Sequence, residues 1–198
     1  MSGRPDIKKK IQGINYDTKI LFSEEEIKTY KKKFKDILKQ EYAIVVTGSS
    51  NLKIGIREKN STKTYPTNKF QKIINKEQIK YIQLGIPEND KLEGVLDFRG
   101  KTNIRETFFL IKNTKFIICS EGMYAHASSA FNIPCITIFT GYNYPQLTYY
   151  KNIIAITPKP LPKCAYCLRS TCIYKHRICL NTINQKEIDQ TINKILNK

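Results

Sequence analysis

The sequence lacks any long hydrophobic run. A helix that crosses a membrane needs roughly 18 consecutive apolar residues, and the 198-residue sequence has no such run. The first residues, MSGRPDIKKKIQG, also lack the apolar stretch of a secretory signal. We therefore expect a cytoplasmic protein, with a peripheral position at the inner face of a membrane as the alternative.

Acidic residues are scarce as well. The 17 Asp and Glu residues are outnumbered by 34 Lys and Arg residues, which gives a formal net charge of +17. Such a charge attracts polyanions: nucleic acid, an anionic membrane surface or a phosphorylated substrate. The lysines are scattered, without an Arg-rich patch or an aromatic RNA-binding strand, which argues against nucleic acid. The abundance of Lys, Asn and Ile is also typical of AT-rich coding sequences, which is an alternative source of the charge.

The apolar residues that are present alternate between strand and helix patterns. Strands are expected over residues 42–47, 81–84, 116–119, 135–139 and 153–156, with a short one within 94–100. Helices are expected over 23–40, from 66, and over 103–112, 122–131 and 185–196. Ser23, paired with Glu26, and Asn103 are suited to cap two of these helices. This order predicts an α/β fold with a mostly parallel sheet and helices on both faces.

Two parts of the chain differ in character. Residues 1–40 form a basic N-terminal arm followed by a helix, and residues 41–198 form the α/β domain, which includes a Cys-rich knuckle at 163–180. In parallel sheets, ligands bind outside the carboxyl ends of the strands. Polar turns follow several of the strands, so we expect a site where they meet: 47–50, 84–90, 120–126 and 140–142.

The turn at 120–126 has the strongest chemical character, because it contains His126, one of only two histidines. A helix that begins near Gly122 would direct free backbone N–H groups at an anion such as a diphosphate. His126, one turn on, could donate to a phosphate oxygen, and Glu121 could accept from sugar hydroxyls. The alternative is structural: Glu121 caps the helix and His126 packs among small residues.

The stretch DFRGKTNIRE…CSEGMYAHASSAFNIPCITIFTG resembles the C-terminal domain of glycosyltransferase family 9, the ADP-heptose-type heptosyltransferases. The family's G-x-[TS]-x-[IL]-x-E stretch is matched by residues 100–106, its acid-to-His turn by Glu121 and His126, and its later elements by Pro134 and residues 139–141. The usual D-S-G-x-x-H is altered here: Glu replaces Asp, and the glycine lies one place earlier.

Further pieces extend the resemblance to roughly residues 42–196. The family's phosphate-binding K-x-[WY]-P is matched by Lys63–Pro66, and its polar turn after the first strand by Thr47–Ser50. An acid that reaches the ribose would correspond to Glu88. The resemblance implies that the following residues contact a nucleotide-diphosphate sugar: Thr47, Ser49, Ser50, Lys63, Glu88, Glu121, Gly122, Met123, His126, Thr140 and Gly141.

The family has the GT-B architecture, in which two Rossmann-like domains face each other. The C-terminal domain holds the donor, whereas the N-terminal domain holds the acceptor and the expected base of the reaction. The resemblance therefore implies a Rossmann-like donor-binding half that transfers a heptose or related sugar to a glycan, lipopolysaccharide or protein acceptor. The alternative is a non-catalytic module or subunit whose partner supplies the acceptor domain. Because no Asp-x-Asp occurs, we expect no catalytic Mg²⁺, and the resemblance assigns no catalytic residue.

Four of the six cysteines are clustered as Cys164-x₂-Cys167-x₄-Cys172-x₆-Cys179. In a cytosolic chain, this spacing favours a structural metal site, with zinc as the default and iron as an alternative. His176 could replace one thiolate, and a set of free thiols is the alternative without metal. A zinc-dependent nucleic-acid binder is a third functional hypothesis, based on charge and cysteines alone. The other two cysteines, Cys119 and Cys135, are expected in core strands.

Overall fold

The computed structural model describes residues 18–48, 61–74, 79–148, 150–174 and 176–197. They form a six-stranded sheet in the order β3-β2-β1-β4-β5-β6, with every neighbouring pair parallel. The strands are β1 (Tyr42–Val46), β2 (Lys80–Gln83), β3 (Leu96–Asp97), β4 (Ile117–Ser120), β5 (Cys135–Ile138) and β6 (Ile153–Ile156). The predicted α/β fold with a parallel sheet is confirmed.

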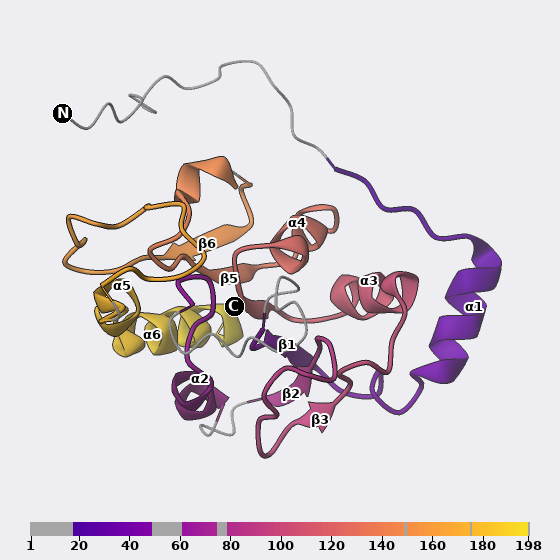
Figure 1. The fold of residues 1–198 in the computed structure, drawn as a ribbon. Coiled ribbons are helices and arrows are strands. Elements are labelled where there is room, and N and C mark those ends of the chain that lie inside the picture. Colours follow the sequence, from indigo (N-terminus) through magenta and orange to yellow (C-terminus); the bar gives the residue numbers. More distant parts are fainter. Residues whose placement is uncertain (1–17, 49–60, 75–78, 149, 175, 198) are drawn as a thin grey trace.

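Helices cover both faces of this sheet (Figure 1). They are α1 (Glu24–Lys33), α2 (Thr67–Ile74), α3 (Ile104–Lys112), α4 (Met123–Ser129), α5 (Ile178–Asn181) and α6 (Gln185–Leu196), with a 3₁₀ turn at Pro145–Leu147. Alternate residues of the central strands point to opposite faces: Val45 packs with α2 and α6, whereas Ile44 packs with α1, α3 and α4. Within the described residues, none of the helices combines the length and apolar character that crossing a membrane requires.

Helix α1 begins at the predicted capping box, in which Ser23 and Glu26 exchange hydrogen bonds. It is attached to α3 by Arg105, whose guanidinium donates to both carboxylate oxygens of Glu26 at 2.7 and 2.8 Å. This bond lowers the pKa of Glu26 to about 2. The prediction that the helix continues to residue 40 is wrong: Phe34 leaves helical geometry (φ −104°, ψ 19°), and it turns with Ile37 into the core.

Helix α3 begins at the predicted cap, Asn103, which forms a capping box with Glu106. The spacing of its apolar residues predicts that Ile104, Phe108 and Ile111 face the core. Ile111 is buried as predicted, whereas Ile104 is exposed in the first turn.

Candidate functional site

The strand order reverses between β1 and β4, because β1 leads to β2 on one side and β4 leads to β5 on the other. In open α/β sheets this switch point creates a crevice at the carboxyl ends of the strands. Thr47 and Gly48 follow β1, and Glu121 and Gly122 follow β4. The predicted contacts Ser49 and Ser50 lie outside the described residues.

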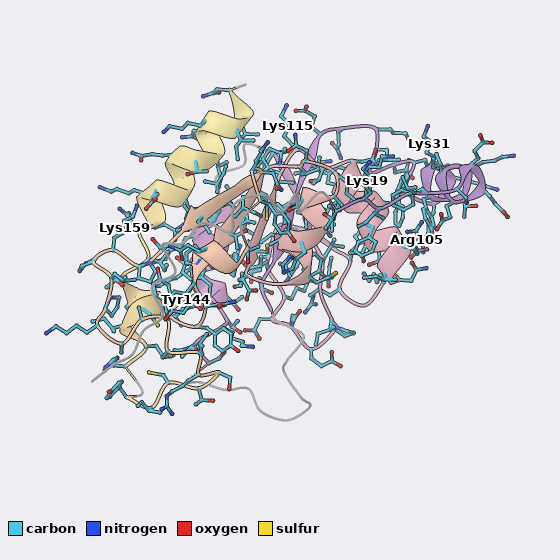
Figure 2. All side chains as sticks on the ribbon, turned by 90° about the horizontal axis from the view of Figure 1, so that it is seen from above. Lys19, Lys31, Arg105, Lys115, Tyr144 and Lys159 are labelled. Atoms are coloured by element: carbon cyan, nitrogen blue, oxygen red, sulfur yellow. The ribbon has the colours of Figure 1, made fainter. Side chains whose placement is uncertain are left out.

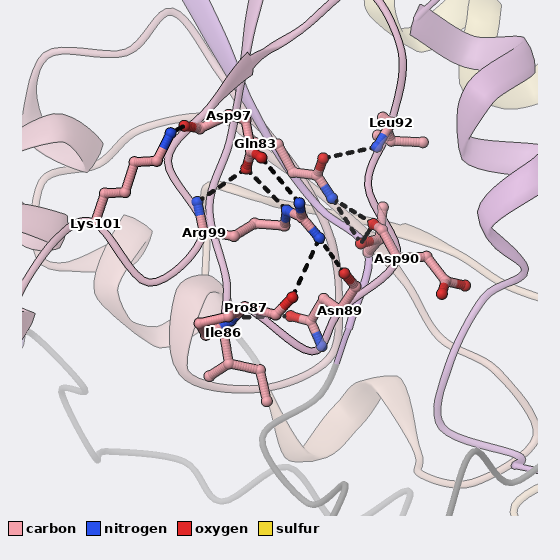
Figure 3. Close-up of polar contacts among 10 residues, drawn as sticks. Gln83, Ile86, Pro87, Asn89, Asp90, Leu92, Asp97, Arg99 and Lys101 are labelled. Carbon is pink, nitrogen blue, oxygen red and sulfur yellow. Dashed lines mark hydrogen bonds and ion pairs between the residues drawn. The ribbon is translucent and has the colours of Figure 1, made fainter.

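The loop after β2 is held by Arg99, which follows β3 (Figure 3). The guanidinium donates to both carboxylate oxygens of Asp97 at 2.8 Å and to the backbone carbonyls of Pro87 and Asn89. The hydrogen bond from Arg99 holds the pKa of the Asp97 carboxyl well below its usual range. The Arg99 guanidinium thus binds both the Asp97 carboxylate and the backbone of the loop after β2. Glu88 lies in this loop and is exposed.

Gln83, the last residue of β2, connects this loop to the end of β1. Its buried amide donates to Thr47 Oγ1 at 3.0 Å and to the Asp90 carbonyl at 2.7 Å, and its Oε1 accepts from Leu92 N at 2.8 Å. Thr47 Oγ1 in turn donates to the Asp90 carbonyl at 3.1 Å. The predicted donor contact Thr47 is therefore buried and engaged in this network.

Asn89 fills the space between the loops after β1 and β2. Its Oδ1 accepts from Ile86 N at 3.2 Å, whereas its buried Nδ2 has no acceptor among the described residues. A Cβ at Gly48 would come within 2.0 Å of this Nδ2, and one at Gly85 within 2.4 Å of Oδ1. The sequence indicated Gly48 only as part of a polar turn; the close approach to Asn89 is what requires glycine there.

Helix α4 begins after Gly122, whose φ of 149° suits glycine. Among the described residues other than its chain neighbours, no atom lies within 4 Å of the position that a Cβ on Gly122 would occupy. Met123 is exposed at the first helical position. The helix was predicted over 122–131 but comprises seven residues and ends at Ser129; Asn132 then adopts a left-handed conformation, with φ 54°.

His126 lies on the exposed side of α4. Its Nδ1 is 3.0 Å from the Tyr150 hydroxyl, and the two rings meet edge to face with centroids 5.6 Å apart. Tyr150 had no place among the predicted site residues. The histidine has a defined protein partner, and its contact with a phosphate stays a prediction.

Three of the predicted residues converge: Lys63, Glu121 and Thr140. Together with Phe139, Tyr142 and Asn143 they line a hollow of about 10 Å³. The Lys63 ammonium lies 4.0 Å from the centre of the Tyr142 ring, and Thr140 Oγ1 donates to the Thr62 carbonyl. A volume of about 10 Å³ accommodates no more than one water, so a nucleotide would have to lie over this hollow, outside it.

Gly141, also predicted to contact the donor, packs against the Cys-rich segment, residues 161–180; its contact with the donor stays a prediction. A Cβ on Gly141 would lie 2.5 Å from Cys179 Sγ. The Gly141 carbonyl accepts from Cys167 N at 3.1 Å. Cys167 and Cys179 of the segment therefore lie directly beside the loop after β5.

The four clustered cysteines line one cavity of about 320 Å³, together with His176, Arg169 and Arg177. Cys179 is buried, which raises the pKa of its thiol, and the three neighbouring thiols act in the same direction. As placed, no three His, Cys, Asp or Glu side chains of the described residues are arranged to hold a metal ion. The remaining cysteines, Cys119 and Cys135, are buried in the core as expected, with sulfurs 3.7 Å apart.

No protein-family model matches the sequence, and no curated protein matches it. Solved structures do match its fold. A glycosyltransferase of family 9 from Veillonella parvula aligns with a TM-score of 0.70 and 12% identity over 93% of this chain and 55% of that chain. ADP-heptose lipopolysaccharide heptosyltransferase II from E. coli aligns with a TM-score of 0.64 and 14% identity over 90% and 53%. TibC, an iron-containing dodecameric glycosyltransferase from enterotoxigenic E. coli, aligns with a TM-score of 0.59 and 16% identity over 80% and 45%.

This chain spans about half the length of the two first-named structures. At such low identity, the likeness concerns the fold. The resemblance noted in the sequence is confirmed at that level: the chain has the Rossmann-like architecture found in heptosyltransferases of glycosyltransferase family 9.

Proposed function

We propose that this chain binds the nucleotide-diphosphate part of a sugar donor at the carboxyl ends of β1, β4 and β5, and that it serves a glycosyltransferase reaction of the family 9 type. The observation that carries the proposal is the meeting of Lys63 and Glu121 beside the switch point of the sheet. They come from segments far apart in the sequence, so the fold itself assembles a cation and an acid where this class of sheet binds ligands.

Each residue has a role that suits its chemistry. The Lys63 ammonium can contact the diphosphate and offset the negative charge that builds on it as the bond to the sugar breaks. Glu121 is half-buried and can accept from sugar hydroxyls. No described residue beyond its chain neighbours crowds the Cβ position of Gly122, which would let a ligand approach the backbone there. Ser49, Ser50, Glu88 and His126 remain proposed contacts of the same donor.

The nature of the donor is suggested by proteins of the same fold. The E. coli heptosyltransferase WaaC has been solved with ADP and with ADP-2-deoxy-2-fluoro heptose, and TibC with ADP-D-beta-D-heptose. We therefore propose an adenine nucleotide sugar, with heptose or a related sugar, and a glycan, lipopolysaccharide or protein as the acceptor.

A second candidate is a donor-binding module that does not catalyse transfer by itself. It is favoured by the single sheet that the described residues form, since this sheet accounts for one Rossmann-like unit. In that case, a partner subunit would supply the acceptor domain and the base. Donor binding is common to both candidates and is the property to test first.

The test is thermal unfolding with ADP, UDP, GDP, CDP and ADP-heptose, with ADP-ribose as the control ligand. A specific ligand at ~100 times its dissociation constant should stabilise the protein by about 2.7 kcal/mol. Lys63→Met should lose most of the shift and Lys63→Arg should keep part of it. Lys72→Met, an exposed lysine on α2, is the matched control and should behave as wild type. If no nucleotide stabilises the protein, or Lys63→Met responds fully, the proposed site is wrong.

We also propose that the four clustered cysteines hold a structural metal ion, zinc or iron. All four thiols line the same cavity, and a metal would favour their thiolate forms. The two arginines in the lining would compensate the negative charge of such a centre. Metal analysis of the purified protein should find about one ion per chain, and Cys172→Ser should lose it. Metal-free protein with unchanged stability would contradict the proposal.

A further inference from the structure

Two segments of the chain meet at the hollow that contains Lys63. One includes Thr62 and Lys63 itself, and the other is the loop after β5, which carries Tyr142. The Lys63 ammonium lies over the Tyr142 ring, 4.0 Å from its centre. The direction of this lysine therefore depends on how the two segments are held relative to each other.

Thr62 is buried and forms hydrogen bonds in two directions. Its N–H donates to the Ser170 carbonyl at 2.9 Å, and its hydroxyl donates to the Arg169 carbonyl. Its own carbonyl accepts from the hydroxyl of Thr140, in the loop after β5. Thr62 thus joins the Cys-rich segment to that loop and fixes the backbone from which Lys63 extends.

The same stretch of the Cys-rich segment also holds the loop after β5. The N–H of Cys167 donates to the Gly141 carbonyl at 3.1 Å, and that of Leu168 donates to the Tyr142 carbonyl at 3.0 Å. Leu168 has a left-handed φ of 55°. This conformation costs free energy in a leucine and persists where surrounding contacts hold it. The consecutive residues 167–170 therefore contact both sides of the hollow.

A ring contact strengthens the attachment to the loop after β5. Tyr166 lies against Tyr144, with ring centroids 4.6 Å apart and an angle of 31° between the ring planes. Figure 2 shows Tyr144 on the side of the molecule away from Lys31 of α1. Side chains as well as backbone groups thus connect the Cys-rich segment to this loop.

We propose that residues 167–170 of the Cys-rich segment position Lys63 for the diphosphate of the donor, with Thr62 as the positioning residue that connects them. The inference rests on the proposed function, in which Lys63 contacts the diphosphate. If the segment opens, Thr62 loses two hydrogen bonds and Lys63 is no longer held over Tyr142, so donor affinity falls. By linkage, a bound nucleotide stabilises the closed segment to the same degree.

The first test follows the Lys63–Tyr142 contact by NMR and needs no nucleotide. Reductive ¹³C-methylation labels the lysines and keeps their charge, and methyl groups over an aromatic ring resonate at lower chemical shift than those of exposed lysines. The Lys63 signal, identified by its loss in Lys63→Arg, should be shifted in this way in wild type but not in Tyr142→Leu. Thr62→Val should lose much of the shift, whereas Thr62→Ser, which keeps the hydroxyl, should retain it.

The second test measures ADP affinity by calorimetry on unlabelled proteins. Thr62→Val should bind ADP about tenfold more weakly, and Thr62→Ser nearly as wild type. Thr114→Val is the matched control, because Thr114 is also buried and its hydroxyl donates to the carbonyls of Tyr42 and Phe116, at the amino end of β4. This control should be destabilised in urea like Thr62→Val but should keep the Lys63 signal and the ADP affinity.

A third test uses wild type alone, so it does not depend on a variant that folds. Trypsin cleavage after Arg169 requires the Arg169 carbonyl to leave Thr62. ADP at ~10 times its dissociation constant should slow this cleavage about fivefold. Cleavage after Lys39, an exposed residue in the turn that follows α1, should not change.

Three results would overturn the inference: an unshifted Lys63 signal in wild type, a Thr62→Val protein that keeps both the signal and the affinity, or an equal loss of both in Thr114→Val. ADP binding that leaves cleavage after Arg169 unchanged would overturn it as well. Failure of wild type to bind ADP would instead count against the proposed function, and the NMR comparison would still decide whether the segment positions Lys63.

Discussion

Two connections beside the candidate site are held in different ways. The loop after β2 carries its own stabilising groups: Arg99 fixes Asp97 and two carbonyls, and Gln83 fixes Thr47 and Asp90. The Cys-rich segment is attached mainly by backbone hydrogen bonds to Thr62, Gly141 and Tyr142 and has four thiols around a cavity. The first is held by side chains of the chain itself, whereas the second has a donor set that suits an added ion. Stability should therefore respond to different changes in the two regions.

The largest effect is expected from Arg99→Met. The change leaves the Asp97 carboxylate and two carbonyls without their common donor, which should lower the free energy of unfolding by about 3 kcal/mol. Arg99→Lys keeps the positive charge but not the paired hydrogen-bond geometry. Its free energy of unfolding should therefore lie between those of wild type and Arg99→Met. Urea unfolding measures both. Lys91→Met, an exposed change in the same loop, is the control and should have little effect; a loss equal to that of Arg99→Met would refute the role of the guanidinium.

Gly48→Ala should come next. The new Cβ would overlap the Asn89 amide, and overpacking of this kind costs about 2 kcal/mol. Asn89→Ala removes the obstacle, so the double variant should be less destabilised than the sum of the two single variants. Strict additivity in urea unfolding would show that the two loops are not in close contact.

Metal removal should affect the other region. Treatment with phenanthroline should open the Cys-rich segment and raise its trypsin cleavage after Lys163 and Arg169 on the order of tenfold. Cleavage after Lys91, in the loop after β2, serves as the internal control and should not change. Mass spectrometry of the fragments distinguishes the sites, and equal acceleration at all three would remove the contrast between the regions.

The smallest effect is a pH dependence of the loop after β2. Arg99 depresses the pKa of Asp97 in the folded protein from its ordinary 3.8. The stability that ionised Asp97 gives to the folded protein is therefore fully present above this ordinary pKa. It is lost as the pH falls through the pKa of the folded state. Thermal unfolding at decreasing pH should show a smaller acid-induced decline for Asp97→Asn than for wild type. Parallel curves would mean that the pair contributes nothing.

Local features of the fold could be predicted from the sequence. Ser23 was predicted as a helix cap because its partner Glu26 lies within one turn, and Asn103 because it directly precedes a helical apolar pattern. The central strands were recognised because short apolar runs between polar turns have few alternatives. The early end of α1 could not be predicted, since Phe34 and Ile37 fit a continuing helix and only the core decides otherwise.

The candidate site was predictable in part. Topology and resemblance both pointed to the loops after β1 and β4, and the structure brings Lys63 to Glu121. The roles of Gln83, Arg99 and Asn89 were missed, because hydrogen bonds between different loops leave no periodic signal. Placement of Gly141 against Cys179 was missed for the same reason.

The strand order also bears on how the site comes into being. In the described part of the chain, strands β1 to β3 pair among themselves, as do β4 to β6, and the β1–β4 ladder alone joins the two sets. Each set consists of neighbours in sequence, whose pairing closes shorter loops than the joining ladder, which spans a longer stretch of chain. The crevice lies at that seam. We therefore expect the binding site to be the last part of the sheet to assemble during folding.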